Sequence, residues 1–100
     1  MSNSERKFEL GNLVATKSIN DKMHKDPVFR AFVIASLGMH VRCDWGDLCD
    51  EDKLINEEAL SSGQGRLFSS YTSKWGAKEK IWIITEWDRS TTTILFPEEY

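Results

Sequence analysis

The spacing of apolar residues divides the chain into a helical first part and a strand-rich last part. From Pro27 to about Val41, apolar side chains recur at helical spacing and form one broad stripe. Asp26 precedes this run as a candidate N-cap, and Pro27 takes the first helical position, where a missing N–H costs nothing. The pattern therefore predicts a main helix that begins at Pro27.

Two further helices are predicted, one on each side of the main helix. Ser18 is the candidate N-cap of a short helix that ends near Lys25. Asp44 or Asp47 caps a third helix, and the glycine-rich run at 61–65 ends it. The apolar residues of this third helix are expected to face the core: Leu54, Ile55 and Leu60.

The last third of the chain is rich in β-branched and aromatic residues, which favour strands. Three strands are predicted over residues 66–72, 80–87 and 91–96, and their short connections imply an antiparallel meander. Residues 13–16 supply a fourth strand, which we place beside 91–96. Such a sheet needs a cover for its apolar face. We therefore predict an α+β fold, with two to three helices packed on one face of a three- to four-stranded antiparallel sheet.

Length and composition are those of one small globular domain. A chain of 100 residues with 29% charged residues is of ordinary domain size and lacks the composition of a disordered protein. Residues 1–9 are expected to form a flexible lead-in, and residues 10–100 the single domain.

The N-terminus lacks the apolar stretch of a signal peptide, and no run approaches the roughly 18 apolar residues of a membrane span. We therefore expect a cytoplasmic protein with reduced cysteines and no membrane partner.

The acidic residues are concentrated in one segment. Residues 44–58 hold seven acids and one base, which gives a local charge of minus six (minus seven plus one), whereas the whole chain carries minus three. The sequence pI near 5.3 argues against direct nucleic-acid binding. The segment is either a negative face for a basic protein partner, or a solvated helix whose first-turn acids stabilise its N-terminus.

Trp45 stands within this segment, in a predicted loop between two helices. Tryptophan is enriched among binding hot spots, but aromatic rings in such loops also close the end of a core, and the sequence leaves both readings open. The predicted partner-binding residues are Asp44, Trp45, Asp47, Asp50, Glu51, Asp52, Glu57 and Glu58.

A metal site is the first chemical alternative. His40, Cys43 and Cys49 form an irregular H-x2-C-x5-C triplet, to which Asp44 or Asp47 could add a fourth ligand. Structural zinc sites usually show two close pairs of ligands instead. We therefore predict no metal and no cofactor, and we interpret His40 as a helix C-terminal residue that interacts favourably with the helix dipole.

Acid–base chemistry is the second alternative. Glu86, Asp88 and Arg89 cluster at a strand end, and Asp44 and Asp47 cluster near a helix start. If both groups lined one cleft, the protein could be a small hydrolase or a metal-assisted enzyme. The competing interpretation is an ion pair between Arg89 and a carboxylate that pins the turn. The sequence favours this structural role, because no residue stands in a sequence motif typical of a catalytic nucleophile.

Several motifs resemble a family of short bacterial proteins found on plasmids and other mobile elements. Its members typically read G-x-x-VAT, then RHxxGDWGDL-x-x-ED, then ITEADRS-x-TTILLP-x-EY, and most are described as hypothetical or plasmid-related. The matching residues here are Gly11–Thr16, Asp44–Leu48 with Glu51 and Asp52, Asn56 and Glu57 with Ala59 and Leu60, and Trp82–Tyr100. The chain departs from the pattern at His40–Cys43 and at Trp87, where alanine is usual. The Cys43 departure argues further against a metal site.

This resemblance implies a function in the contest between mobile elements and host defence. Small acidic proteins that block CRISPR or restriction nucleases are one solution such elements use, and many place carboxylates where DNA phosphates would bind. We therefore predict a non-enzymatic accessory protein that binds a basic, nucleic-acid-binding defence protein through its acidic segment, as an anti-CRISPR or anti-restriction inhibitor. The alternatives are the enzyme described above and a homodimeric scaffold whose acidic segment is merely solvated.

Overall fold

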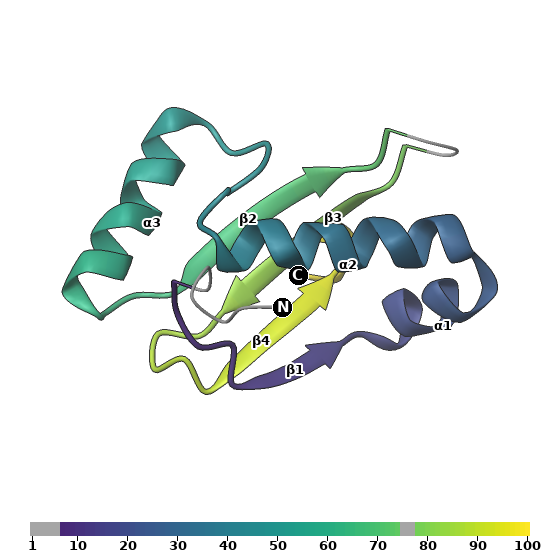
Figure 1. The fold of residues 1–100 in the computed structure, drawn as a ribbon, viewed down its shortest axis with the longest axis horizontal. Coiled ribbons are helices and arrows are strands. Elements are labelled where there is room, and N and C mark those ends of the chain that lie inside the picture. The colour runs from purple at the N-terminus through teal and green to yellow at the C-terminus, as the bar shows by residue number, and fades with distance from the viewer. Residues whose placement is uncertain (1–6, 75–77) are drawn as a thin grey trace.

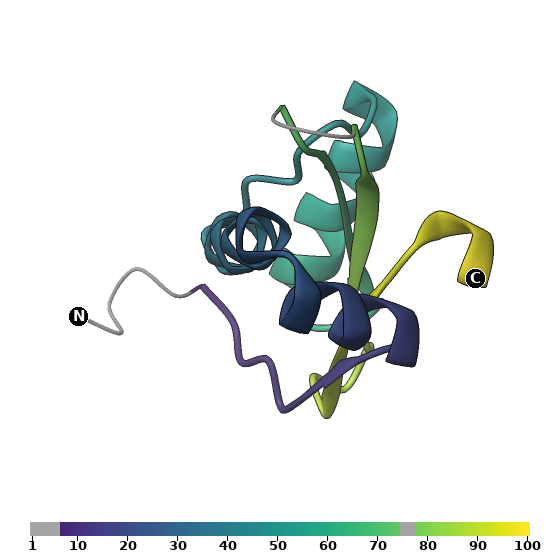
Figure 2. The same cartoon turned by 90° about the vertical axis from the view of Figure 1, so that its right-hand side faces the viewer.

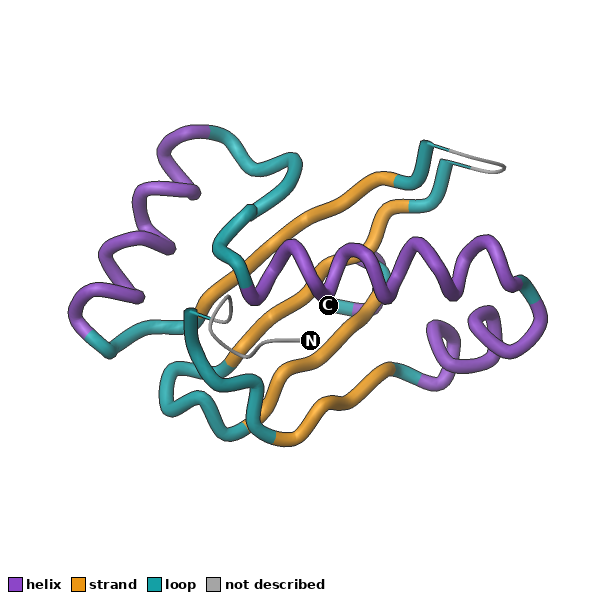
Figure 3. The backbone as a smooth tube through the Cα atoms, viewed as in Figure 1, coloured by secondary structure: helices purple, strands orange, loops and turns teal. Residues whose placement is uncertain are grey.

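The computed structural model describes residues 7–74 and 78–100, and these form an α+β fold of three helices and a four-stranded sheet (Figures 1 and 3). Parts of the predicted lead-in and of the turn after residue 73 lie outside the described residues. The elements in chain order are β1 (Asn12–Ala15), α1 (Lys17–Lys25), α2 (Pro27–Val41), α3 (Asp50–Ser62), β2 (Leu67–Thr72), β3 (Lys80–Thr85), β4 (Thr91–Leu95) and the 3-10 helix η2 (Pro97–Glu99).

The sheet has the strand order β1-β4-β3-β2. β2, β3 and β4 form the predicted antiparallel meander, with Ile83 opposite Ile94 in the central pair. β1 lies beside β4 as expected, but the pair is parallel and the sheet is therefore mixed. The α+β prediction is confirmed. β3 and β4 end two residues and one residue before their predicted ends, β2 begins one residue later than predicted, and β1 lies one residue earlier than predicted.

The three helices do not all pack on one face of the sheet. α2 covers one face, and the C-terminal η2 lies on the other side (Figure 2). α3 lies beside the free edge of β2 (Figure 1). The core under α2 consists of Ile19, Phe29, Val33, Tyr71, Ile81, Ile83 and Ile94, and a second cluster at the α3 end consists of Phe8, Leu10, Trp45, Ala59 and Leu67. Because Phe8 is buried, the packed domain begins before the predicted boundary at residue 10.

The start of the main helix agrees with the sequence prediction. The side chain of Asp26 caps α2, because its Oδ1 accepts hydrogen bonds from the backbone N–H groups of Val28 and Phe29, at 3.0 and 3.2 Å. The predicted cap of α1 is wrong by two residues. Thr16 takes that position instead of Ser18, and its Oγ1 accepts from the N–H of Ile19.

Replacing Asp26 tests how much this cap contributes. We expect Asp26→Ala to lower the free energy of unfolding by about 0.5–2 kcal/mol, because two N–H groups of α2 lose their acceptor. Asp21→Ala is the matched control, since Asp21 is an exposed aspartate whose ion pair with Lys17 joins two surface residues. Urea denaturation measures both, and equal midpoints for Asp26→Ala and the parent chain would contradict the capping role.

The predicted caps of α3 are also wrong. The helix begins at Asp50 after Cys49, whose side chain makes no capping hydrogen bond. Asp44 and Asp47 stand earlier and serve the preceding loop: Asp44 Oδ1 accepts from the N–H of Gly46, and Asp47 Oδ2 accepts from Thr72 Oγ1. The helix ends at Gly63 in the left-handed conformation, as the glycine-rich run predicts.

Candidate functional site on the outward face of α3

The loop before α3 runs along the free edge of β2. The N–H of Ser70 donates to the carbonyl of Trp45 at 3.3 Å, and the N–H of Asp47 donates to the carbonyl of Ser70 at 2.7 Å. Gly46 sits between these two bonds with a φ of +75°, and a Cβ at this position would lie 2.0 Å from the carbonyl oxygen of Ser70. Only glycine therefore lets the loop approach β2 this closely.

Asn56 of α3 covers the same edge near its other end. Its Nδ2 donates to the carbonyl of Phe68 at 2.6 Å, and the N–H of Phe68 donates to its Oδ1 at 3.1 Å. The side-chain amide thus takes the place that a neighbouring strand would occupy. Together with the loop, it pairs backbone groups that an edge strand would otherwise leave open to another chain.

Trp45 is a core residue and not a surface anchor. Its side chain is 3% exposed and packs against the rings of Phe8 and His40. The indole Nε1–H donates to Glu57 Oε2 at 2.8 Å, which fastens α3 to the core. The prediction that Trp45 contacts a partner is therefore wrong, because the loop buries the ring beneath α3 and the N-terminal segment.

Three of the predicted partner-binding carboxylates form hydrogen bonds within the protein. Asp44 and Asp47 hold the loop through the N–H of Gly46 and the hydroxyl of Thr72, and Glu57 accepts from Trp45. All three residues remain exposed and add negative charge to this side of the molecule. Their fixed hydrogen bonds nevertheless explain their presence without a partner.

The remaining acids line an outward surface of α3 together with two aliphatic side chains. Leu54 and Ile55 are 60% and 59% exposed, so the prediction that they face the core is wrong. The inward positions belong instead to Asn56 and Ala59, which are buried against β2 and the second core cluster. Helical spacing of 100° per residue then puts four exposed residues on the outward side, which we call the α3 face: Glu51, Leu54, Ile55 and Glu58.

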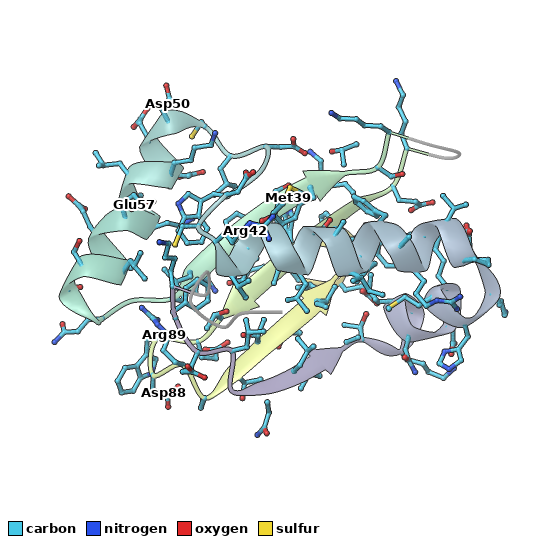
Figure 4. The ribbon with its side chains drawn as sticks, in the orientation of Figure 1. Met39, Arg42, Asp50, Glu57, Asp88 and Arg89 are labelled. Carbon is cyan, nitrogen blue, oxygen red and sulfur yellow. The ribbon has the colours of Figure 1, made fainter. Side chains whose placement is uncertain are left out.

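The other two acids lie beside this face. Asp50 and Asp52 are exposed in the first turn of α3, where the helix dipole favours negative charge. Figure 4 shows Asp50 at the start of α3 and Glu57 further along the helix. Shallow depressions flank Ile55 and Leu54 and are lined by residues of α3 and of the segment 64–68 that follows it. The α3 face is thus a ridge with an aliphatic centre and an acidic border.

The residues of the enzyme alternative do not converge. Asp47 bonds to Thr72 at one end of β2, whereas the guanidinium of Arg89 donates to the carbonyl of Gly65, before the other end of the strand. Six residues of extended strand separate these points by roughly 20 Å. Figure 4 shows Arg89 and Asp88 together at the β3–β4 turn. The arrangement therefore offers no shared cleft for Asp44, Asp47, Glu86 and Arg89.

Arg89 does pin its turn, but through backbone carbonyls and not through a carboxylate. Its guanidinium donates to the carbonyls of Glu86 and Trp87 within the turn, and also to that of Ala59 in the last turns of α3. The residue has a φ of +60°, in the left-handed region. Asp88 accepts instead from the N–H of Ser90, and this hydrogen bonding lowers the pKa of its carboxyl.

His40 belongs to a buried chain of hydrogen bonds and is not a charged residue at a helix end. Its Nδ1 bonds to Ser69 Oγ and its Nε2 to Thr85 Oγ1, which bonds to Thr92 Oγ1. Because Thr92 donates its proton to the carbonyl of Leu10, Thr85 donates to Thr92 and accepts from Nε2–H. The proton of the neutral ring is thus placed on Nε2. Burial lowers the pKa of His40 to about 3, so the ring is neutral at neutral pH and its Nδ1 accepts from Ser69.

The candidate zinc ligands are held in different surroundings. Both nitrogens of His40 are bonded to hydroxyl groups, Cys43 is half-buried, and Cys49 is exposed at the start of α3. Burial raises the pKa of the Cys43 thiol. Within residues 7–74 and 78–100, no group of three or more histidine, cysteine or acidic side chains is placed to hold a metal ion.

Comparison with known proteins leaves the resemblance to the plasmid family as an expectation. No protein-family model, curated protein or solved structure matches the chain. In the part of the chain that the structure describes, no helix is both long enough and apolar enough to cross a membrane. The functional hypothesis therefore depends on the geometry of the α3 face.

Proposed function

We propose that this is a non-enzymatic binding protein that docks its α3 face onto a basic surface of a protein partner. The observation that carries the proposal is the exposure of Leu54 and Ile55 between the carboxylates of Glu51 and Glu58. Neighbouring aliphatic side chains that remain in water on one helix face, with a charged border, are typical of an interaction site.

The spacing of the α3 face suits a helix-in-groove contact. Its four residues stand at positions i, i+3, i+4 and i+7, which is the pattern by which a helix presents anchors to a groove. Full burial of each aliphatic side chain would contribute about 1.5–3 kcal/mol. The flanking acids would steer the approach of a basic partner and select against acidic ones.

A basic, nucleic-acid-binding defence protein is the partner class we propose. Two observations support it: the acidic border of the α3 face, and the resemblance of the chain to proteins of mobile elements. Carboxylates in a groove that normally receives DNA phosphates would compete for the same positive potential. An inhibitor of a CRISPR or restriction nuclease would account for both observations.

Charge reversal on the α3 face tests the proposal. The double variant Glu51→Lys, Glu58→Lys should fold normally, because exposed charges contribute little to stability. Its association with a basic partner, captured from cells that carry a defence system, should slow on the order of tenfold and lose most of its salt dependence. Affinity capture and surface plasmon resonance at several salt concentrations measure both effects.

A matched control distinguishes the effect of charge on the α3 face from the effect of the net charge of the protein. Glu86→Lys, Glu98→Lys makes the same change in charge at two exposed acids outside α3 and should bind like the parent chain. A second variant, Leu54→Ser, Ile55→Ser, should mainly speed dissociation, because it removes apolar area. Normal binding by both α3 variants would rule out the α3 face as the docking surface.

A further inference from the structure

An apolar groove with a volume of about 630 Å³ lies between α2 and the end of β2. Its floor is one side of α2, where Phe32 and Met39 are half-buried against the core under the helix. Figure 4 shows Met39 on the side of α2 that faces β2. Thr72 and Lys74 form the opposite wall. Binding sites for small molecules are typically concave, mostly apolar and of about 300–1,000 Å³, so this groove has the dimensions of a ligand site.

Small side chains in the middle of α2 keep the groove open. Ala31 and Ala35 line it one helical turn apart, so they stand one above the other on the same side of the helix. Val28 lies on this side as well, and its side chain is 54% exposed, whereas the neighbouring Phe29 and Val33 are buried. The result is a strip of apolar surface along α2 that remains in water. Exposed apolar strips with polar rims are typical of binding sites.

The groove is elongated along the helix. The residues that line it extend from Pro27 to Met39, and twelve steps of 1.5 Å give a length of roughly 18 Å. The N–H of Asp44 donates to the carbonyl of Met39 at 2.9 Å, so the loop before α3 lies against that end of the groove. A linear apolar chain that follows the helix axis therefore fits this shape better than a broad, rigid ring system.

Lys74 supplies the charge at the rim of the groove. Its side chain is exposed, and within residues 7–74 and 78–100 no carboxylate forms an ion pair with it. Lys78 adds a second exposed base to the connection between β2 and β3. The hydroxyl of Thr72 is already engaged, because it donates to Asp47 Oδ2 at 2.7 Å, and the charge of this aspartate disfavours an anion there. A ligand with one anionic group would therefore place that group at Lys74.

We propose that the groove binds a free long-chain fatty acid, with its acyl chain along α2 and its carboxylate at Lys74. The acyl chain is linear and apolar, as the strip between Val28 and Met39 requires, and its burial removes this strip from water. The carboxylate accepts hydrogen bonds from Nζ of Lys74. A neutral molecule of the same length would bury the same surface without using the lysine, so the proposal predicts selectivity for the anion.

This site goes beyond the proposed function and does not depend on it. The groove uses α2 and the end of β2, and none of the residues that line it belongs to α3. Charge reversal at Glu51 and Glu58 leaves the groove intact, and filling the groove leaves the α3 face intact. The two proposals can therefore fail independently.

Dodecanoate, used as the monomer below its micelle-forming concentration and at pH 8, where its carboxylate is ionised, tests the site. In protein with ¹³C-labelled methionine methyl groups, an NMR titration should shift the signal of Met39 and leave that of Met23, a residue of α1 outside the groove, unchanged. Ala35→Trp should weaken binding by at least about tenfold, because the indole ring occupies the space of the acyl chain. Ile34→Trp is the matched control, since this 60% exposed position of α2 does not line the groove, and it should bind like the parent chain. Circular dichroism verifies that both variants fold.

Dodecanol tests the role of the charge, because it has the same chain length and no carboxylate. Lys74→Ala should weaken the binding of dodecanoate about tenfold and leave that of dodecanol nearly unchanged. Lys53→Ala, the same change on α3, should bind both molecules like the parent chain. Equal affinity of the parent chain for the two molecules, or an unchanged affinity of Lys74→Ala for dodecanoate, would overturn the assignment of the carboxylate to Lys74.

Three other results would overturn the groove as a fatty-acid site. The first is a Met39 signal that dodecanoate does not shift, and the second is full binding of dodecanoate by Ala35→Trp. The third is a shift of Met39 with vesicles that contain phosphatidylglycerol but not with monomeric dodecanoate, because the surface would then recognise a membrane.

Discussion

Trp45→Ala should lower the free energy of unfolding by about 3–5 kcal/mol, which is a large part of the roughly 5–15 kcal/mol of a typical domain. The substitution leaves a cavity between Phe8 and His40, and it also deprives Glu57 of the indole N–H that joins α3 to the core. Because Trp45 stands in the loop that covers β2, the loss should loosen that edge as well. Thermal and urea denaturation, followed by circular dichroism, measure the change.

Trp87→Ala provides the matched control for this variant. The ring of Trp87 is 62% exposed at the β3–β4 turn, so its removal should change stability by less than about 1 kcal/mol. A core role for Trp45 requires a clear difference between the two variants. Equal, small losses in both would show that Trp45 is not the packed residue the structure describes.

Stability should fall as the pH is lowered from about 6.5 toward 3, and His40 should cause much of the fall. The pKa of His40 is lowered in the folded state to about 3 from its ordinary 6.5. Below pH 6.5 the unfolded chain therefore takes up a proton that the folded chain does not, which favours unfolding by about 1.4 kcal/mol per pH unit. Between pH 6.5 and 4.5 the loss is about 2–3 kcal/mol.

The physical cause of this dependence is the buried chain of hydrogen bonds that joins His40 to hydroxyl groups of the core. The Nδ1 of neutral His40 accepts from Ser69, and a proton added there would force the serine to find another acceptor in the core. His40→Gln should therefore lose this part of the pH dependence, whereas His24→Gln, a change on the surface of α1, should retain it. Urea titrations of the three proteins at pH 6.5 and 4.5 decide the matter. An unchanged pH dependence in His40→Gln would contradict the buried neutral histidine.

Local signals in the sequence predict most of the fold. Asp26-Pro27 fixes the start of α2 because a cap and a first-turn proline act within a few residues, and the β-branched runs identify β2, β3 and β4 for the same reason. The parallel sense of β1 is a tertiary property. It depends on how the chain returns to β4 after three helices and two strands, and no local pattern encodes it.

The candidate site was harder to predict because side-chain hydrogen bonds decide which face of α3 turns inward. Asn56 is buried since it pairs with the backbone of Phe68, and this rotates Leu54 and Ile55 into solvent against their hydropathy. The sequence does contain a signal: the apolar residues of 50–62 do not gather on one helical face, which is unusual for a helix held by hydrophobic packing alone. The same kind of contact makes Trp45 a core residue, although its position among acids suggested an exposed one.

The most direct test of the account is photo-crosslinking from the α3 face inside cells. A photoreactive phenylalanine analogue placed at Ile55 should cross-link to a basic partner protein in bacteria that carry a defence system. The same analogue at Val28, which is similarly exposed at the start of α2, should not. Cross-linking of the partner from position 28 and not from position 55, or from neither position while the partner still co-purifies with the chain, would contradict the claim that α3 is the binding helix.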